Sequence, residues 1–194
     1  GLFAPLMLNE HDETIRCAGG EFHLGAVYKN QIFGVGEKDN GQFSEPFEVT
    51  YIPGASIFCR LEFLQQLGGF REDFFMYLED TELCARVRKA GYEITVVPQA
   101  KVSHISRQES SISEEIEFHK LKNFFSLYLL HAPLNVLPEF VFRYGLWSLI
   151  KSLNNKPQLL RLLRAWYWTF RHSKALFEDR FKSPRSQRRL AQTT

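Results

Sequence analysis

The feature that most constrains this chain is a cluster of carboxylates at the start of a predicted helix. Residues 77–82 read Tyr-Leu-Glu-Asp-Thr-Glu, follow an aromatic run that begins at Phe74, and precede a helical sequence at 83–90 that Gly91 ends. Acidic side chains in the first helical turn and basic ones in the last complement the helix dipole. Carboxylates where a loop enters a helix indicate a functional site, although simple helix capping also explains such a cluster.

Short elements are predicted around this helix. Residues 92–97 and 100–104 read as two strands, and the second ends at His104, for which a structural role stays open beside a ligand role. Residues 60–67 predict a short amphipathic helix. Its side chains expected to face inward are Leu61, Phe63, Leu64 and Leu67.

The first fifty residues indicate loops and short strands without a convincing opening element. Residues 49–52 form a further strand candidate, and Gly54 and Ala55 follow it closely. Small side chains there allow a ligand to come near the backbone, or allow tight packing against a neighbouring strand. Other short apolar pieces lie at residues 2–8, 22–28 and 32–35.

The last third of the chain is predicted to be helical. Ser113 and the glutamates after it resemble an N-terminal cap of a helix that runs to His131. Two more helices are expected at about 138–153 and 157–177. In the last of them one apolar face is predicted, consisting of Leu159, Leu162, Leu163, Trp166, Phe170 and Phe177, with Arg161, Arg164 and Arg171 on another face.

Charge divides the chain into two unlike parts. Residues 1–142 contain 12 Lys and Arg against 20 Asp and Glu, whereas residues 143–194 contain 12 against 2. A basic helical region with interleaved aromatic residues could be a solvated face, could lie on an anionic membrane surface, or could bind nucleic acid. We expect no nucleic acid as partner, because the acidic remainder would repel it. An anionic membrane surface is expected to bind residues 143–182.

Three scattered cysteines and the hydropathy of the chain exclude several classes of protein. An odd number of cysteines without a Cys-x-x-Cys pair argues against a disulfide framework or a zinc site, and favours reduced thiols in the cytoplasm. The longest stretch without a charged residue, 123–138, is too short to span a membrane. Neither a transmembrane helix nor a signal peptide is predicted.

The central stretch resembles the C-terminal half of the catalytic domain of family-2 glycosyltransferases, especially rhamnosyltransferase-like members that build bacterial surface polysaccharide. No single element of this resemblance is specific, but the ordered set is. The matching motifs are Gly54-Ala55-Ser56, Leu67-Gly68-Gly69-Phe70, the aromatic run to Tyr77, Glu79-Asp80-x-Glu82-Leu83-Cys84-x-Arg86, Ala90-Gly91-Tyr92, Val97-Pro98-x-Ala100-x-Val102-x-His104 and Lys122-Asn123.

The resemblance implies an α/β fold, part of a GT-A-type domain with a C-terminal helical extension. It implies that Asp80 is the base that deprotonates the attacking sugar hydroxyl, with Glu79 as its acidic neighbour. It further implies a divalent metal, Mg²⁺ or Mn²⁺, beside the donor diphosphate, with His104 as a ligand. Gly54, Ala55 and Arg86 are expected to bind substrate, although Arg86 could instead hold the helix. Glu82 is expected to solvate or cap the first helical turn rather than to be a second base.

The implied reaction is inverting transfer of a sugar from a nucleotide-sugar donor to a glycan or lipid-linked acceptor, at the cytoplasmic face of the cell membrane. We expect an acceptor-side part at 1–131, a basic helical extension at 132–182 and a disordered tail at 183–194. The chain contains no Asp-x-Asp motif and no nucleotide-binding βαβ unit before residue 49. An N-terminally truncated fragment is therefore expected, and a non-catalytic scaffold is the alternative.

Overall fold

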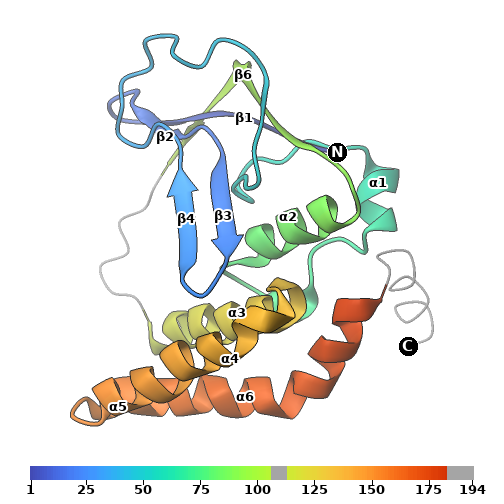
Figure 1. The fold of residues 1–194 in the computed structure, drawn as a ribbon. Helices are drawn as coiled ribbons and strands as arrows, with labels where there is room; N and C mark the ends of the chain where they lie inside the picture. The colour runs from blue at the N-terminus through green and yellow to red at the C-terminus, as the bar shows by residue number, and fades with distance from the viewer. Residues whose placement is uncertain (106–112, 183–194) are drawn as a thin grey trace.

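In the computed structural model, which describes residues 1–105 and 113–182, strands lie on one side of a short central helix and long helices on the other (Figure 1). The strands are β1 (Leu2–Asn9), β2 (Ile15–Cys17), β3 (Gly20–Leu24), β4 (Tyr28–Ile32), β5 (Phe47–Glu48) and β6 (Ile94–His104). The helices are α1 (Leu61–Gln66), η1 (Glu72–Phe74), α2 (Glu79–Lys89), α3 (Glu114–His131), η2 (Leu134–Val136), α4 (Leu137–Phe140), η3 (Val141–Trp147), α5 (Ser148–Ser152) and α6 (Lys156–Phe181).

The main sheet has the strand order β2-β1-β6-β5, in which β1 and β6 run parallel. Two separate strands were expected between residues 92 and 104, and this expectation is wrong because β6 continues through Pro98. The register between β1 and β6 shifts after Pro5, so that Pro5 pairs with Val97 and Leu6 with Lys101. Proline has no N–H to donate to a ladder, and the sheet absorbs both prolines in one bulge instead of ending.

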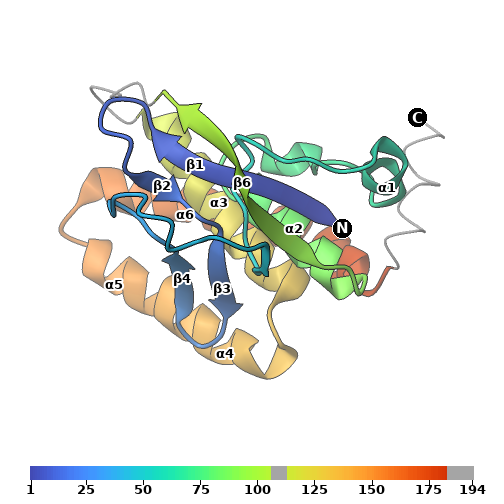
Figure 2. The same ribbon diagram turned by 90° about the horizontal axis from the view of Figure 1, so that it is seen from above.

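The strand expected at residues 49–52 is displaced. The paired strand β5 lies just before it, at Phe47–Glu48. Within residues 49–52, Tyr51 forms an isolated β-bridge to Gly20. Through this bridge the strand segment lies beside the β3–β4 hairpin, whose tip reaches the helical layer (Figures 1 and 2). The Tyr128 hydroxyl of α3 donates to the Gly25 carbonyl at 2.9 Å, and the Tyr28 and Phe124 rings meet edge to face. The hairpin therefore joins the sheet to α3.

Helix α1 has the expected position, but its side chains are not buried. Leu61 is 63% exposed, and no residue of α1 is buried; Leu67, just after the helix, is. The helix lies at the edge of the molecule (Figure 2). The inward face predicted for this helix is therefore wrong for Leu61.

The three predicted C-terminal helices are present. The Ser113 hydroxyl accepts a hydrogen bond from the Ile116 N–H at 3.3 Å, as expected of a cap. Residues 137–152 form one continuous helix whose middle, η3, is a π-helix. Asn155 caps α6, which packs along α3 (Figure 1). In the described part of the chain, no helix is both long enough and apolar enough to cross a membrane.

The apolar face predicted for α6 is wrong in part. The residues of α6 that are buried are Leu162, Ala165, Thr169 and Leu176. Leu163, Phe170 and Phe177 of the predicted face are exposed. Apolar residues occur on both sides of this helix, so periodicity alone could not choose the side that packs on α3.

Helix α6 also reaches the segment that leads into α2. The Arg71 guanidinium pairs with Asp179 of α6 at 3.1 Å and with Asp73 at 2.9 Å. The Lys122 ammonium of α3 lies 4.5 Å from the centre of the Trp168 ring of α6 and donates to the Asp73 carbonyl. Helix α6 is thus part of the framework that supports the acidic cluster. The predicted boundary at residue 131 stays a prediction, and the predicted tail lies outside the described residues.

Candidate functional site

The acidic cluster begins helix α2, as the sequence predicts. Glu79 is the first residue of the helix, and Leu78 before it is left-handed, with φ 64° and ψ 4°. This backbone turns the chain sharply from the aromatic run into the helix. Glu79 and Asp80 are consequently displayed in the first turn, where the helix dipole favours negative charge.

Asp80 accepts hydrogen bonds on both carboxylate oxygens. Oδ2 accepts from the Gly54 N–H at 3.0 Å and from the Tyr51 hydroxyl at 3.2 Å. Oδ1 accepts from the N–H of Thr81 at 2.6 Å and from its hydroxyl at 3.3 Å. Four donors fix the position of this carboxylate, and the two hydroxyl contacts are the longest and so the most easily exchanged for another hydroxyl.

Glu79 has a different environment. Its Oε2 atom is buried and has no hydrogen-bond partner among the described residues. Burial raises the pKa of this carboxyl, and the nearby negative charge of Asp80 adds to the rise. Two adjacent carboxylates in unlike surroundings are an arrangement that active sites use to separate acid and base roles.

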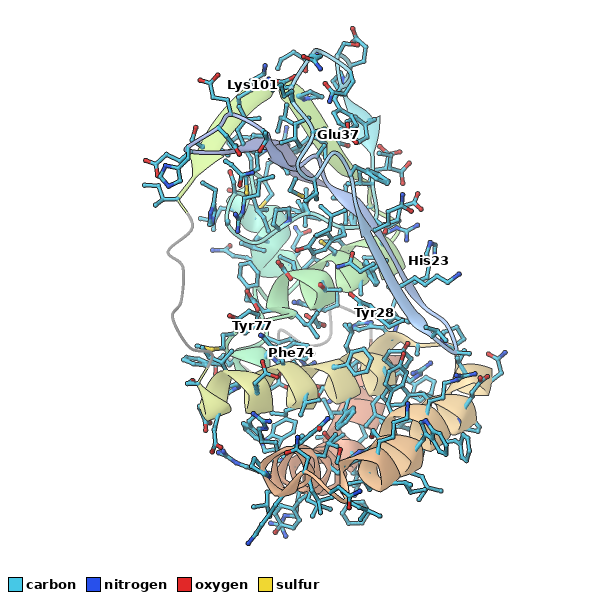
Figure 3. The ribbon with its side chains drawn as sticks, turned by 90° about the vertical axis from the view of Figure 1, so that its left-hand side faces the viewer. His23, Tyr28, Glu37, Phe74, Tyr77 and Lys101 are labelled. Carbon is cyan, nitrogen blue, oxygen red and sulfur yellow. The ribbon has the colours of Figure 1, made fainter. Side chains whose placement is uncertain are left out.

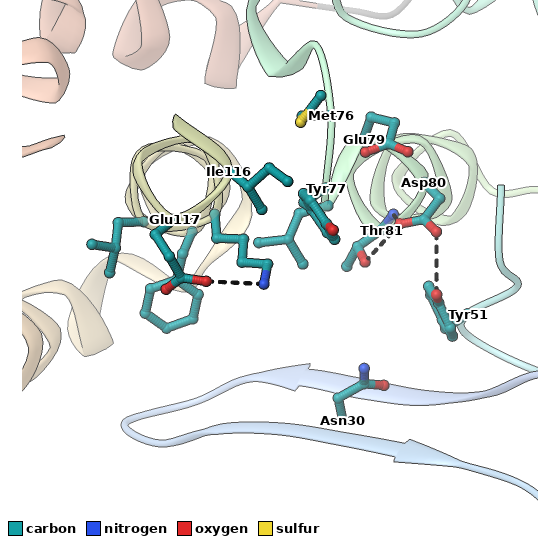
Figure 4. Close-up of a pocket in the computed structure, with 13 residues that line it drawn as sticks. Asn30, Tyr51, Met76, Tyr77, Glu79, Asp80, Thr81, Ile116 and Glu117 are labelled. Carbon is teal, nitrogen blue, oxygen red and sulfur yellow. Dashed lines mark hydrogen bonds and ion pairs between the residues drawn. The ribbon is translucent and has the colours of Figure 1, made fainter. Parts of the chain in front are cut away.

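Both carboxylates line a cavity of about 750 Å³ between α2, α3 and the β3–β4 hairpin (Figure 4). Tyr77 lies at its centre in the view of Figure 4, with the Lys120 ammonium 4.7 Å from the centre of its ring. Asn30 faces the cavity from β4. Lys120 in turn pairs with Glu117 at 3.0 Å. Apolar walls come from Met76, Leu78, Ile116, Leu121 and Phe124.

The cavity lies where the two layers of the molecule meet. Figure 3 shows Tyr28, Phe74 and Tyr77 at the level where the hairpin and α2 approach α3. Phe74 is completely buried, whereas Tyr77 is 39% exposed. Within the aromatic run, Phe74 therefore packs in the core, whereas the Tyr77 ring remains accessible in the cavity.

The two small residues expected to bind substrate differ in placement. A Cβ atom on Gly54 would lie 3.3 Å from the Asp80 Cβ, so the backbone at Gly54 lies directly against the carboxylate. Ala55 is exposed and does not line the cavity. A substrate-binding role for both residues stays a prediction.

Arg86 is not available to bind substrate, so that expectation is wrong. Its side chain is 4% exposed and pairs with Glu82 at 2.7 Å. The guanidinium also donates to the carbonyls of Leu67 and Gly69 at 2.5 and 2.7 Å. The alternative considered from the sequence, that Arg86 holds the helix, agrees with these contacts.

Glu82 is the acidic partner of a buried network rather than a capping group. It is 0% exposed, and besides Arg86 it contacts His131 of α3 at 3.0 Å. Burial alone would raise the pKa of Glu82, but the hydrogen bond from His131 and the charge of Arg86 overcome this effect and lower it to about 2. The network ties α2 to α3 and to the turn at Leu67.

His104 ends β6, opposite Asn9 of β1. Its Nδ1 atom is buried without a hydrogen-bond partner in the described ranges, and it does not line the cavity that contains Asp80. Among residues 1–105 and 113–182, no group of three His, Cys, Asp or Glu side chains converges closely enough to hold a metal ion. The described side chains therefore do not form a metal centre by themselves, and the predicted ligand role of His104 stays a prediction.

Sequence reasoning missed four polar residues of the cavity. Tyr51 reaches it from the segment after β5, Asn30 from β4, and Glu117 and Lys120 from α3; none belongs to the acidic motif. The Tyr51 hydroxyl contacts Asp80 across 29 residues of sequence. No local sequence pattern predicts such a contact. The one indication is that Tyr51 precedes Gly54, which belongs to a matching motif, by three residues.

Comparison with known proteins identifies the family. Residues 33–182 match the family described as glycosyl transferase family group 2. The chain belongs to this family. The match includes the acidic cluster, every residue of the cavity lining except Asn30, and the C-terminal helices. The predicted family is confirmed.

Two curated relatives of this chain are named as transferases. An N-acetylglucosaminyl-diphospho-decaprenol L-rhamnosyltransferase of Mycobacterium tuberculosis is 42% identical over 62 residues, which are 31% of this chain and 20% of that protein. A pre-mycofactocin glycosyltransferase of the same species is 38% identical over 61 residues, or 31% of this chain and 13% of that protein. The aligned region is thus a minor part of each relative.

A solved structure supports the fold. The crystal structure of GalNAc-T7 with UDP, GalNAc and Mn²⁺ matches 92% of this chain and 34% of that one, with a TM-score of 0.51 and 18% identity. The predicted GT-A-type α/β fold with a helical C-terminal part is confirmed. At this identity the likeness concerns the fold alone.

Proposed function

We propose that this glycosyltransferase supplies the acceptor side of an inverting sugar transfer, in which Asp80 is the general base. The observation that carries the proposal is the position of Asp80, hydrogen-bonded at the start of α2 and open to a cavity of about 750 Å³. Its hydroxyl partners are the sort of group that an acceptor sugar would replace. By family resemblance, the donor is a nucleotide sugar.

The proposed step is a single displacement. The acceptor hydroxyl gives its proton to Asp80 while its oxygen forms a bond to the anomeric carbon of the donor sugar. The bond from that carbon to the diphosphate breaks at the same time, and the nucleoside diphosphate leaves from the opposite face, which inverts the configuration. A hydroxyl is a weak nucleophile at neutral pH, and a positioned carboxylate contributes about 10²–10⁴-fold to such a reaction. A divalent metal would counter the charge on the diphosphate; no part of this step depends on it.

The walls of the cavity favour an acceptor with both polar and apolar parts. The Tyr77 ring offers a face on which a sugar can stack, and the Lys120 ammonium beside it offers a charge to an acceptor phosphate. Ile116, Leu121 and Phe124 continue the wall along α3 as apolar surface. A lipid-linked sugar, as in the synthesis of cell-surface polysaccharide, has these three parts in this order.

Exchange of the carboxylate tests the base role. In a protein that contains this chain and transfers sugar, Asp80→Asn should lower kcat about 10²-fold or more while the protein stays folded, because the amide cannot accept the proton. Glu62→Gln, which changes an exposed carboxylate of α1 outside the cavity, is the matched control. Turnover of Asp80→Asn near that of the control would remove Asp80 from the base role.

We also propose that the C-terminal helices lie on an anionic membrane surface at the cytoplasmic face. Residues 143–182 contain nine Lys and Arg against two Asp and Glu. The exposed apolar residues of α6 are spaced by three, four or seven positions and so lie on one face of the helix. They are Leu160, Leu163, Tyr167, Phe170, Phe177 and Phe181. A second exposed set lies on the helix before it, and consists of Phe142, Leu146, Trp147, Ile150 and Leu153. Apolar insertion and basic charge together are typical of helices that lie in a membrane interface.

Vesicle sedimentation with paired substitutions tests this surface. Phe170 is 76% exposed on α6 and Phe58 is 75% exposed beside the sheet, so they form a matched pair. Phe170→Ser should weaken binding to vesicles that contain phosphatidylglycerol by about 10- to 100-fold, since a buried aromatic ring contributes about 1.5–3 kcal/mol. Phe58→Ser should have no effect, and added salt should weaken binding of both variants. Equal binding by the two variants, or equal binding to neutral vesicles, would contradict the proposal.

A further inference from the structure

The backbone just before the acidic cluster is strained. Phe75, Tyr77 and Leu78 have φ angles of 50°, 63° and 64°, in the region that residues other than glycine rarely adopt. At Phe75 the chain makes a three-residue turn, in which the Met76 N–H donates to the Phe74 carbonyl at 2.6 Å. This turn, with ψ −65°, is of the rare and strained kind. The segment needs support from outside itself to keep this shape.

One buried side chain of α3 provides direct contacts to this segment. Asn123 is 0% exposed, and its Nδ2 atom lies 2.6, 2.8 and 2.7 Å from the carbonyl oxygens of Phe74, Met76 and Tyr77, which share its two hydrogens. The opposite orientation of the amide would place its oxygen against three carbonyl oxygens. The position therefore requires a hydrogen-bond donor, and the amide NH₂ of Asn123 supplies it.

We propose that Asn123 is a positioning residue, which holds the strained backbone of residues 74–78 and thereby sets Tyr77 and the Glu79-Asp80 pair in place. This inference rests on the proposed function, since it assigns Asn123 to the same acceptor cavity. Tyr77, whose carbonyl Asn123 binds, lines that cavity, and Glu79 begins α2 two residues later. A loosened segment would move the ring and the carboxylates together.

Hydrogen exchange in the 194-residue chain tests the contact itself. Asn123→Ala should speed amide exchange in residues 74–80 at least tenfold, because the three carbonyls lose their donor while the backbone strain remains. Ser126→Ala is the matched control: Ser126 is buried in the same helix, and its hydroxyl donates only to the Lys122 carbonyl one turn before. Exchange in 74–80 that is no faster in Asn123→Ala than in Ser126→Ala would overturn the proposal.

A glycine substitution distinguishes support of strain from general packing. Phe75 is 71% exposed, so its side chain can be removed at little cost in packing. In the Asn123→Ala background, Phe75→Gly should recover much of the slow exchange, since glycine adopts positive φ freely. Phe75→Ala removes the same ring without that freedom and should recover none. Equal recovery by the two would contradict a role in holding strain.

Transfer kinetics test the consequence for the site. Asn123→Ala should lower kcat at least tenfold and raise KM for the acceptor, with KM for the donor unchanged, and Phe75→Gly should restore part of kcat. Unchanged kinetics despite faster exchange would overturn the positioning role and leave the base role of Asp80 intact, because Asp80→Asn tests that role separately. Where Asn123→Ala does not fold, Asn123→Gln keeps the amide and should give the same changes in smaller measure; wild-type exchange and kinetics in that variant would count against the proposal.

Discussion

The buried network of Glu82, Arg86 and His131 leads to a quantitative prediction for stability. Glu82→Gln keeps the shape of the side chain and removes its charge, which leaves the Arg86 guanidinium buried without a counter-ion. Arg86 donates through Nε to both Glu82 oxygens, at 2.9 and 2.8 Å. Removal of one partner from a buried ion pair costs about 3–5 kcal/mol. We therefore expect the free energy of unfolding at pH 7 to fall by about that amount.

The same network predicts a dependence of stability on pH. The pKa of Glu82 is lowered from 4.5 to about 2 in the folded state. The stabilisation is complete above the unfolded pKa and is lost as pH falls towards the folded one, so the window lies between about pH 4.5 and 2. Above this window the charged carboxylate stabilises the folded state in full, and below it that contribution is lost as the carboxylate takes up a proton. Glu82→Gln should lack this part of the acid sensitivity.

Urea denaturation followed by tryptophan fluorescence measures both effects. Unfolding curves at pH 7 and at steps down to pH 3 give the free energy and its slope for each variant. Glu139→Gln is the matched control, since its partner Arg143 lies one turn away at 2.9 Å and both side chains are about half exposed. That surface pair should contribute less than about 1 kcal/mol. A Glu82→Gln variant with the stability and pH slope of the wild-type protein would refute the reasoning.

Two other substitutions test local features. Gly54→Ala would place a Cβ atom 3.3 Å from the Asp80 Cβ. Turnover should fall about tenfold while the thermal unfolding midpoint changes little. A lower midpoint with unchanged turnover would assign Gly54 to packing alone. Ser113→Ala removes the hydroxyl that accepts from Ile116 N–H and should lower stability in urea by about 1 kcal/mol. In Ser173→Ala, which alters an exposed hydroxyl inside α6, stability should change little; a loss equal to that of Ser113→Ala would argue against the cap.

The helix starts could be predicted because their signals are local. Glu79 and Asp80 mark the start of α2 by charge, and Ser113 marks that of α3 by its hydroxyl. Both signals act within one helical turn, so no knowledge of the remaining fold is needed. The same reasoning located the acidic half of the cavity.

Features that depend on distant partners could not be predicted. The i, i+4 spacing allows Glu82 and Arg86 to pair, but the burial of Arg86 also depends on the carbonyls of Leu67 and Gly69, 19 and 17 residues away. Asn30 and Lys120 meet in one cavity although 90 residues separate them in the sequence. For α6, apolar residues on opposite sides made the packed face ambiguous until the position of α3 was known.

The ion pair between Arg71 and Asp179 also bears on how the protein is made. The two residues are 108 positions apart in the sequence. At the usual rate of synthesis, about 5–20 residues per second, Asp179 follows Arg71 by roughly 5–20 seconds. During that time the emerging chain contains the acidic motif but not yet the end of α6, which anchors the segment before that motif. The side of α3 that packs against this part of α6 is then uncovered. The ribosome must therefore release almost all of the described chain before the site can assume its final shape.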